Sequence, residues 1–232
     1  MRNRRFLGKP DSGGWAARDQ MMTASDCGAI LGMLPEKWGR NRSTVIQGKL
    51  TGGEWRQTRR MWWGTEDETD NLRKLGLMSG LRTRSNHGFY SHADFPLVGA
   101  TTDGLLVRPL GWSPDPFLGH VNLIGVAERM HDLALEQLQL VAAHPSRLGL
   151  AELKLTEGYF AKEWDNGPPE WYEAQVQLQL LCTELPWALL VARIGSADMR
   201  WWFVGFDESR ARLYAAEMQA AANELAALRK GQ

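Results

Sequence analysis

The chain contains 232 residues, of which 44% are hydrophobic and 23% are charged, a balance typical of a folded protein with one or two domains. Its 27 basic and 27 acidic residues cancel, so net charge identifies no partner, although residues 1–100 hold 16 Lys or Arg against 10 Asp or Glu. Two cysteines without CxxC spacing exclude a disulfide framework or a cysteine-rich zinc site, and no apolar run is long enough to span a membrane, so a cytoplasmic protein is expected.

The first 14 residues are expected to be a flexible lead-in to a single domain over 15–232. Residues 15–33 predict two short helices that meet at a turn, with Thr23 or Ser25 as an N-cap. A long helix is expected over 55–76, with Gly76 as its stop signal. Strands joined by turns follow over 77–85 and 88–109, and after a loop rich in Pro and Gly the residues 125–144 have helical periodicity.

The second half of the chain alternates between strands and helices. Residues 147–156 predict a strand, and 168–185 predict a helix that starts with Pro just inside it. Two more strands are expected over 187–195 and 199–206, before Asp207 caps an Ala-rich helix that ends near Arg229. This order indicates an α/β or α+β fold with a mixed central β-sheet flanked by helices.

The strand AELKL places two opposite charges on one face. Glu152 and Lys154 are two residues apart, so their side chains leave the same side of a strand, while Leu153 faces the core. Taken alone, this pattern favours an ion pair on a half-exposed sheet face. Charged residues rarely enter an apolar segment unless they are paired or used, so a functional interpretation needs a second feature.

That second feature is the segment VGATTDGLL, in which a strand ends at Asp103. The following Gly104 allows a tight turn, which is the ordinary interpretation of an Asp-Gly pair. Together with Glu152, however, Asp103 supplies two carboxylates, and Mg²⁺ prefers oxygen ligands and keeps several waters. A neighbouring lysine can then position or deprotonate an attacking water, or stabilise charge in the transition state.

Five motifs in order resemble the PD-(D/E)xK nuclease superfamily, and within it the lambda-exonuclease-like, YqaJ-type viral recombinase family. They span roughly residues 15–206. They are TASDCGAILG (23–32), WWGTEDE (62–68), HADFPLVGATTDG (92–104), AELKL (151–155) and PPEWYEAQVQLQL (168–180). The resemblance implies a restriction-endonuclease-like core and a metal-dependent deoxyribonuclease.

The resemblance also assigns roles to residues. Asp103 and Glu152 would bind Mg²⁺, for which Mn²⁺ is a substitute, with the Leu153 carbonyl as a third ligand. Lys154 would act on the nucleophilic water, and Gln175 would orient Lys154 or the DNA backbone.

A third acid of the site is expected from the helix that carries GTEDE. The spacing from Gly64 selects Glu68, which would serve a second metal site or hold a metal-bound water, with Glu66 and Asp67 as the structural alternatives. His87, His92 and the two cysteines are interpreted as structural.

The DNA contacts expected from the sequence fall in three places. An Arg and a Ser at the positions of Arg18 and Ser25 would hold the 5′-phosphate, although an N-cap beside a surface arginine explains them equally well. Tyr172 and Gln179 share a helix face with Gln175 and are expected to approach DNA, whereas Gln177 lies on another side and is interpreted as structural. In RQTRRMWW, Arg59 or Arg60 is expected to contact phosphate, while the tryptophans are expected to pack inward.

The expected activity is 5′-to-3′ degradation of one strand of linear duplex DNA. The resulting 3′ overhangs would feed a single-strand annealing protein, and the resemblance implies a ring-shaped homotrimer in a bacterial cytoplasm. An endonuclease of the same superfamily and a non-catalytic DNA-binding or phage assembly protein are the alternatives. Asp103 and Glu152 are 49 positions apart, so an insertion at about 108–147, of open role, separates two strands expected to be neighbours.

Overall fold

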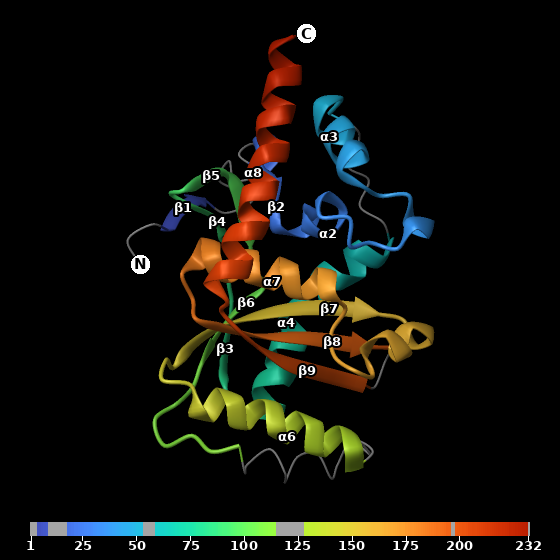
Figure 1. The fold of residues 1–232 in the computed structure, drawn as a ribbon. Helices are drawn as coiled ribbons and strands as arrows, with labels where there is room; N and C mark the ends of the chain where they lie inside the picture. The colour runs from blue at the N-terminus through green and yellow to red at the C-terminus, as the bar shows by residue number, and fades with distance from the viewer. Residues whose placement is uncertain (1–3, 9–17, 53–58, 115–127, 196–197, 232) are drawn as a thin grey trace.

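A computed structural model describes residues 4–8, 18–52, 59–114, 128–195 and 198–231, without the side chains of 59–66, 128–131 and 159. It is a mixed α/β fold with two sheets (Figure 1). The larger sheet has the order β3-β6-β7-β8-β9, in which only β7 and β8 are parallel neighbours. Its strands are β3 (Arg82–Ser85), β6 (Gly104–Val107), β7 (Leu148–Thr156), β8 (Trp187–Ile194) and β9 (Asp198–Gly205).

The smaller sheet has the order β1-β4-β5-β2. Its strands are β1 (Arg4–Gly8), β4 (Phe89–His92), β5 (Phe95–Thr101) and β2 (Met22–Thr23). The helices are α2 (Cys27–Ile30), α3 (Arg42–Leu50), α4 (Arg59–Ser79), α6 (Glu128–Ala143), α7 (Glu170–Thr183) and α8 (Glu208–Lys230), with 3₁₀ turns η2 (Ala24–Asp26), η3 (Glu36–Trp38) and η4 (Gly158–Trp164).

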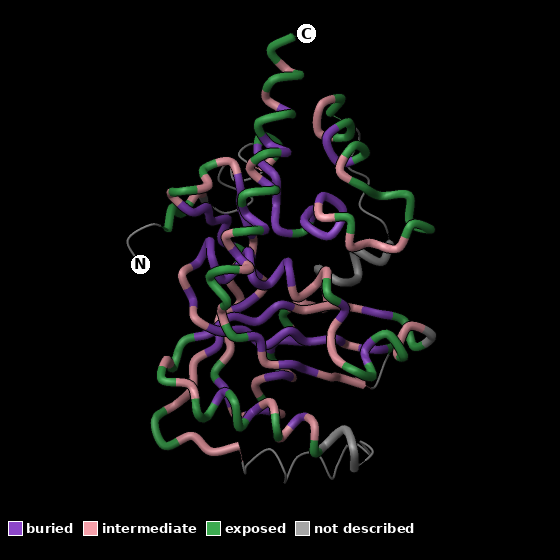
Figure 2. The backbone as a smooth tube through the Cα atoms, in the orientation of Figure 1, coloured by how far each residue is buried: buried purple, intermediate pink, exposed green. Residues whose placement is uncertain are grey.

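Helix α7 forms the centre of the molecule. It contacts β4 and β5 of the smaller sheet as well as β8 of the larger one, and every residue from Ala174 to Thr183 is buried (Figure 2). A helix that is buried on all sides has no solvent-facing stripe, which explains its weak amphipathic pattern. The glutamines inside it therefore must find partners within the protein.

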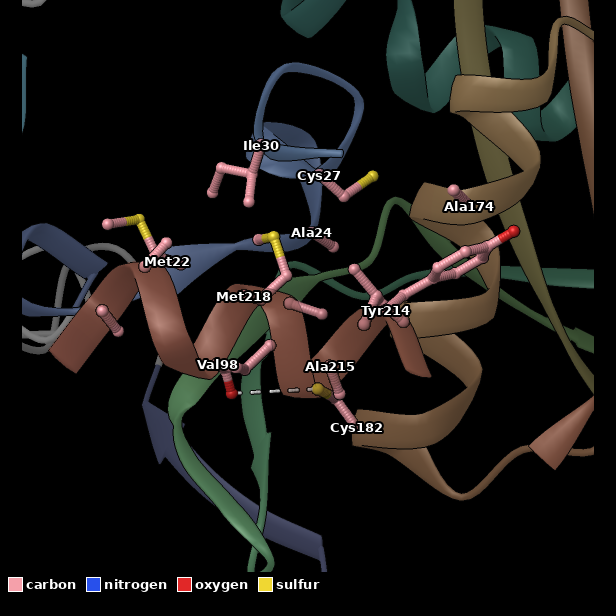
Figure 3. Close-up of a cluster of buried hydrophobic side chains, with 14 of the residues drawn as sticks. Met22, Ala24, Cys27, Ile30, Val98, Ala174, Cys182, Tyr214, Ala215 and Met218 are labelled. Carbon is pink, nitrogen blue, oxygen red and sulfur yellow. Dashed lines mark hydrogen bonds between the residues drawn. The ribbon is translucent and has the colours of Figure 1, made fainter. Parts of the chain in front are cut away.

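Apolar packing joins α7 to the segments on both sides. Toward the smaller sheet, Cys182 packs with Met22, Val98 and Met218 in the cluster shown in Figure 3. Toward the larger sheet, Val176 and Leu180 meet residues of β7, β8 and β9. Burial of apolar area contributes about 25 cal/mol per Å², so both clusters stabilise the fold.

The insertion between Asp103 and Glu152 is part of the core. Its helix α6 lies along the face of the larger sheet opposite α7 (Figure 1), and Leu138 and Val141 are fully buried there. The same cluster contains Leu72 and Leu75 of α4. The sequence left the role of the insertion open, and for α6 the structure gives an answer, because this helix covers apolar sheet surface.

Close packing on β7 requires a glycine. A Cβ atom on Gly149 would lie 2.4 Å from ring atoms of Trp187, whose side chain is completely buried. The indole of Trp187 donates a hydrogen bond to the Ser146 carbonyl at 3.1 Å. The Leu-Gly-Leu start of the strand thus accommodates a tryptophan of the neighbouring strand β8.

Three boundaries differ from those expected. Residues Arg4–Gly8 are not a flexible lead-in but the edge strand β1, because Phe6 packs on Tyr90 and the strand pairs with β4. Helix α4 continues past Gly76 to Ser79, since the left-handed conformation needed to end it is adopted by Gly80, with φ of 69°. Pro169 occupies the N-cap of α7 instead of its first turn.

None of the described helices combines the length and the apolarity needed to cross a membrane.

Candidate active site

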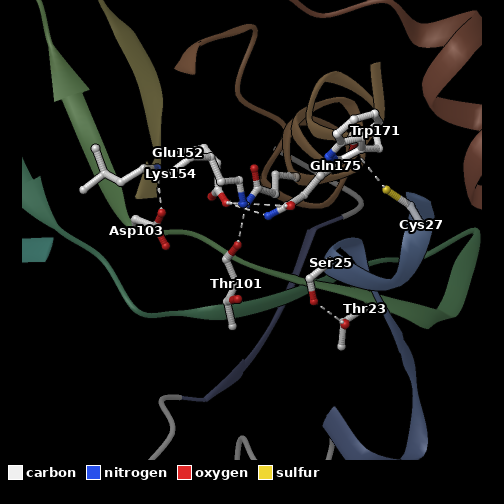
Figure 4. Close-up of polar contacts among 11 residues, drawn as sticks. Thr23, Ser25, Cys27, Thr101, Asp103, Glu152, Lys154, Trp171 and Gln175 are labelled. Atoms are coloured by element: carbon white, nitrogen blue, oxygen red, sulfur yellow. Dashed lines mark hydrogen bonds and ion pairs between the residues drawn. The ribbon is translucent and has the colours of Figure 1, made fainter. Parts of the chain in front are cut away.

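The ladder between β6 and β7 brings two distant acids together. Gly104 pairs with Ala151 at the end of this antiparallel ladder, so Asp103 precedes one member of the pair and Glu152 follows the other. Beyond this point Asp103 Oδ2 accepts a hydrogen bond from the Leu153 amide at 2.7 Å (Figure 4). Strand pairing therefore brings Asp103 and Glu152 close together although they are 49 positions apart in the sequence.

Alternation along β7 divides its side chains between two layers. Leu153 packs into the cluster under α4 and α6, whereas Glu152 and Lys154 lie on the side of α7. Glu152 is only 3% exposed, and its Oε1 is 2.6 Å from Lys154 Nζ. Glu152 is buried and the Lys154 side chain is only 17% exposed, so a fully solvated ion pair at the surface does not explain the pattern.

Two glutamines of α7 complete the surroundings of Glu152. Gln175 donates to Glu152 Oε1 at 2.5 Å and accepts from Lys154 Nζ at 2.9 Å. One turn later, Gln179 donates to Glu152 Oε2 at 2.6 Å and to the Thr101 carbonyl at 2.8 Å. Both carboxylate oxygens are thus held by side chains whose own positions are fixed by the buried helix.

Lys154 is held in its charged form. Burial alone would lower its pKa, but the charge of Glu152, then those of Tyr172 and Asp103 and the hydrogen bond to Glu152, outweigh burial and raise the pKa. The ammonium also lies 4.8 Å from the centre of the Tyr172 ring, a cation–π distance. Tyr172 in turn stacks on the buried Trp164 at 5.4 Å.

A third acid approaches from α4. The Glu68 side chain is 14% exposed, and burial followed by the charge of Glu152 raises its pKa to about 7. Its Oε1 is buried without a hydrogen-bond partner among the described residues, although His87 Nδ1 lies 3.3 Å from it. The pKa of Asp103 is raised well above its usual value by burial, then by Glu152 and Glu68.

Of the two acids that are alternatives to Glu68, the structure describes the side chain of Asp67 only. Asp67 accepts a bond from Arg193 of β8 at 2.6 Å, and Arg193 also contacts Asn71 at 3.4 Å. Asp67 is therefore engaged in docking α4 onto the sheet, and the next residue, Glu68, interacts with Glu152. The side chain of Glu66 lies outside the described part of the structure.

The acids suit a hard divalent cation. The charge of Glu152 contributes to the raised pKa of both Glu68 and Asp103, so a positive charge placed among these carboxyl groups would relieve their repulsion. No three His, Cys, Asp or Glu side chains in the described ranges already converge as a complete ligand set. Asp103 and Glu152 offer carboxylate oxygens, the ligand type that a hard ion such as Mg²⁺ accepts in small number while it retains water.

Of the two residues expected to bind phosphate, Arg18 lies near these acids. The charges of Asp26, Asp103 and Glu152 all act on Arg18, and burial lowers its pKa. Ser25 is exposed in the turn η2 and its Oγ is 2.9 Å from Thr23 Oγ1. The N-cap of this turn is Thr23, and α2 is only four residues long, so the contribution expected from a helix dipole at Ser25 is small.

Other expected contacts are placed differently. Gln179 is 1% exposed and bound to Glu152, so the expectation that it touches DNA is wrong, because no surface is left for a ligand. Gln177 bridges the Gly205 carbonyl and the Asp207 amide, which confirms its structural interpretation. The side chains of Arg59 and Arg60 lie outside the described residues.

The role of Gln179 was the main feature that sequence reasoning missed. Its spacing of four residues from Gln175 places both amides on one helix face, and that signal was available. The spacing does not reveal that the face points inward. Only the complete burial of α7 decides that the two amides hold Glu152.

Comparisons with known proteins give one family. Residues 15–186 match the profile described as the YqaJ-like viral recombinase domain. No curated protein matches the chain.

Solved structures share the fold. An alkaline exonuclease from Laribacter hongkongensis, LHK-Exo, is 19% identical with a TM-score of 0.64 over 94% of this chain and 93% of that one. The same protein in complex with dAMP gives 19% identity and a TM-score of 0.63, with 93% and 92% covered. A phage related exonuclease from Haemophilus somnus 129PT is 11% identical with a TM-score of 0.55, covering 88% and 92%.

Proposed function

The chain belongs to the family of YqaJ-like viral recombinase domains, and from this premise we propose that it is a Mg²⁺-dependent DNA exonuclease. The observation that carries the proposal is the convergence of Asp103, Glu152 and Lys154 at the end of the β6–β7 ladder. Each member has a defined partner, and Glu152 is buried where an unused charge would only destabilise the fold.

Asp103 and Glu152 are the residues that would hold the metal. In a strand, the amide and the carbonyl of one residue point to the same edge, so the Leu153 carbonyl points to the edge on which Asp103 accepts the Leu153 amide. This supports the carbonyl as a third ligand. Glu68 would hold a metal-bound water or serve a second ion. When bound, Mg²⁺ supplies positive charge at the phosphate and activates water, and Mn²⁺ has the same preference for oxygen.

Lys154 acts as a charged group. In the metal-free protein the charge of Glu152 outweighs burial and raises the pKa of Lys154, which favours the protonated ammonium. A fixed ammonium stabilises the negative charge that develops on the phosphate oxygens during hydrolysis, and it costs no reorganisation because Glu152 and Gln175 hold it in place. Of the roles expected for the lysine, charge stabilisation is therefore the one we favour.

Arg18 and Ser25 are proposed to bind the 5′-phosphate of a DNA end. The proximity of Arg18 to Asp26 on one side and to Asp103 and Glu152 on the other supports a binding position next to the site of hydrolysis. An end held there would lead to 5′-to-3′ degradation of linear duplex DNA. Tyr172, whose ring makes a cation–π contact with Lys154, is proposed to lie beside the bound strand.

The biological setting that we propose is the one suggested by the family. The product would be duplex DNA with single-stranded 3′ overhangs, the substrate of a single-strand annealing protein in phage-type recombination. We further propose that the enzyme works as a homotrimer around DNA in the bacterial cytoplasm. Light scattering of the purified protein measures the trimer directly, and a monomeric mass in the presence of DNA would contradict it.

One cleavage experiment tests the activity. Purified protein is incubated with Mg²⁺ and with linear or covalently closed circular duplex, and the linear DNA is supplied with and without a 5′-phosphate. We expect loss of linear DNA only, faster with the phosphate, and no loss after addition of EDTA. Nicking of the circles would instead indicate an endonuclease, and intact DNA in every reaction would refute both activities.

A further inference from the structure

A series of aromatic rings leads from the surface to the active-site lysine. Trp38, in η3, is 42% exposed and meets Trp171 edge to face, with ring centres 5.5 Å apart. Trp171 lies 5.7 Å from Tyr172, whose ring carries Lys154 Nζ at 4.8 Å. Because no step exceeds 5.7 Å, the exposed indole lies within a few nucleotide lengths of Lys154, at roughly 3.4 Å per nucleotide of stacked DNA.

The inner ring of this series is firmly fixed. A Cβ atom on Gly28 would lie 2.8 Å from Trp171 Cβ, so α2 packs directly against the start of α7. Figure 4 shows Trp171 beside Cys27 and one turn from Gln175. The Cys27 thiol donates to the Trp171 carbonyl at 3.7 Å. Trp171 therefore gives Trp38 a rigid support.

Trp38 itself has no such enclosure. It stands on a three-residue turn ended by Gly39, which adopts a left-handed φ of 61°. A large aromatic side chain of which two fifths remains in water contributes less to folding than a buried one. Its exposed surface is available to a flat ligand.

The segment that carries Trp38 holds two basic residues, Lys37 and Arg40, against one acidic residue, Glu36. Arg40 has a side chain that is 49% exposed, and its guanidinium contacts Asp26 at 2.7 Å. Lys49 lies 3.4 Å from the same carboxylate, so two cations share one acid and leave an excess of positive charge. Exposed aromatic rings beside cations are the combination by which proteins bind single-stranded nucleic acid, with bases stacked on the rings.

We propose that Trp38, supported by Trp171, stacks on a nucleobase of the DNA strand that enters the active site, close to its 5′ end. The inference rests on the proposed nuclease function, because that function brings a separated strand to Lys154. Arg40 contacts the backbone of the same strand. The site takes any base, since every base offers an aromatic face.

Binding of short oligonucleotides tests the stack without requiring cleavage. A series of single strands is used, each with a 5′-phosphate and a fluorophore at the 3′ end. One strand is intact, and each of the others has a single abasic residue at one of positions 1 to 5. The affinity of the protein for each strand is measured by fluorescence anisotropy in EDTA. For the wild-type protein, we expect an abasic residue at one position to weaken binding roughly 5- to 150-fold, as expected for one stacked base.

The variants separate stacking from folding. Trp38→Ala should bind the intact strand more weakly by a similar factor, and the abasic residue should cause no further loss of affinity. In Trp38→Phe, the abasic residue should weaken binding as it does in the wild type. Leu213→Ala, at an exposed apolar residue of α8, is the matched control and should bind normally. Thermal unfolding of each variant checks that the fold is intact.

Two outcomes overturn the proposal and are distinct. If Trp38→Ala binds but remains as sensitive to the abasic residue as the wild type, the stack is refuted while the nuclease proposal stands. If the wild-type protein binds no strand and degrades no linear duplex, both proposals are refuted together.

Discussion

Replacement of Glu68 by glutamine should stabilise the metal-free protein at alkaline pH. The carboxyl group lies among other acids, and burial followed by the charge of Glu152 raises its pKa from the ordinary 4.5 to about 7. The folded state therefore binds a proton more tightly than the unfolded state does. The resulting penalty is absent below pH 4.5, grows between pH 4.5 and 7, and is complete above pH 7.

The size of the effect follows from the two pKa values. At about 1.36 kcal/mol per pKa unit, the interval corresponds to roughly 3 kcal/mol at pH 8 and to less than about 1 kcal/mol at pH 5. The Glu68 side chain keeps 14% of its surface in water, which reduces the penalty, so we expect about 1–3 kcal/mol. The amide of glutamine has nearly the same shape and carries no charge, so it removes this term.

Urea unfolding in EDTA at pH 5 and pH 8 measures the difference. Glu68→Gln should exceed the wild type in free energy of unfolding at pH 8, and most of that gain should vanish at pH 5. Glu136→Gln, at an exposed glutamate of α6, is the matched control and should change little at either pH. The reasoning is refuted if Glu68→Gln changes stability equally at both pH values.

Four further outcomes are expected. Lys154→Ala should lower cleavage at least 100-fold while linear DNA still binds, and full activity would show that the site is misassigned. Gln179→Leu leaves a buried carboxylate oxygen without its donor and should cost about 1–3 kcal/mol in urea unfolding; an unchanged midpoint would contradict this. Gly149→Ala forces an indole to move and should cost a similar amount, visible in near-ultraviolet circular dichroism. Cys27 and Cys182 are buried, and burial raises the pKa of each thiol to about 12. Both should therefore react with a thiol reagent at pH 8 only after unfolding, and rapid labelling of the native protein would argue against their burial.

Local patterns predicted most of the elements and much of the candidate site. Period-two alternation places Glu152 and Lys154 on one side of β7, and Asp207 does cap the last helix by accepting the Arg210 amide at 3.0 Å. Such features depend on residues a few positions apart, so they are visible in a single segment. The motif order also identified the family that residues 15–186 match.

The bounds of helices and strands that depend on distant contacts could not be predicted from the local sequence. The strand β1 forms because Phe6 packs on Tyr90, more than 80 positions away. The sequence of residues 4–8 alone does not predict that partner. The end of α4 depends on which of two glycines, Gly76 or Gly80, adopts a left-handed conformation. Both have the required freedom, and the position of the next strand decides between them.

The sequence by itself determined which chemical groups the protein possesses and which face of its own strand or helix each one occupies, because those follow from covalent geometry. Tertiary structure alone decided which groups meet. The ladder Gly104–Ala151 joins Asp103 to Glu152, and the contact between Arg193 and Asp67 docks α4 so that Glu68 reaches the same place. Distances between elements depend on packing of the whole core, and no short segment contains that information.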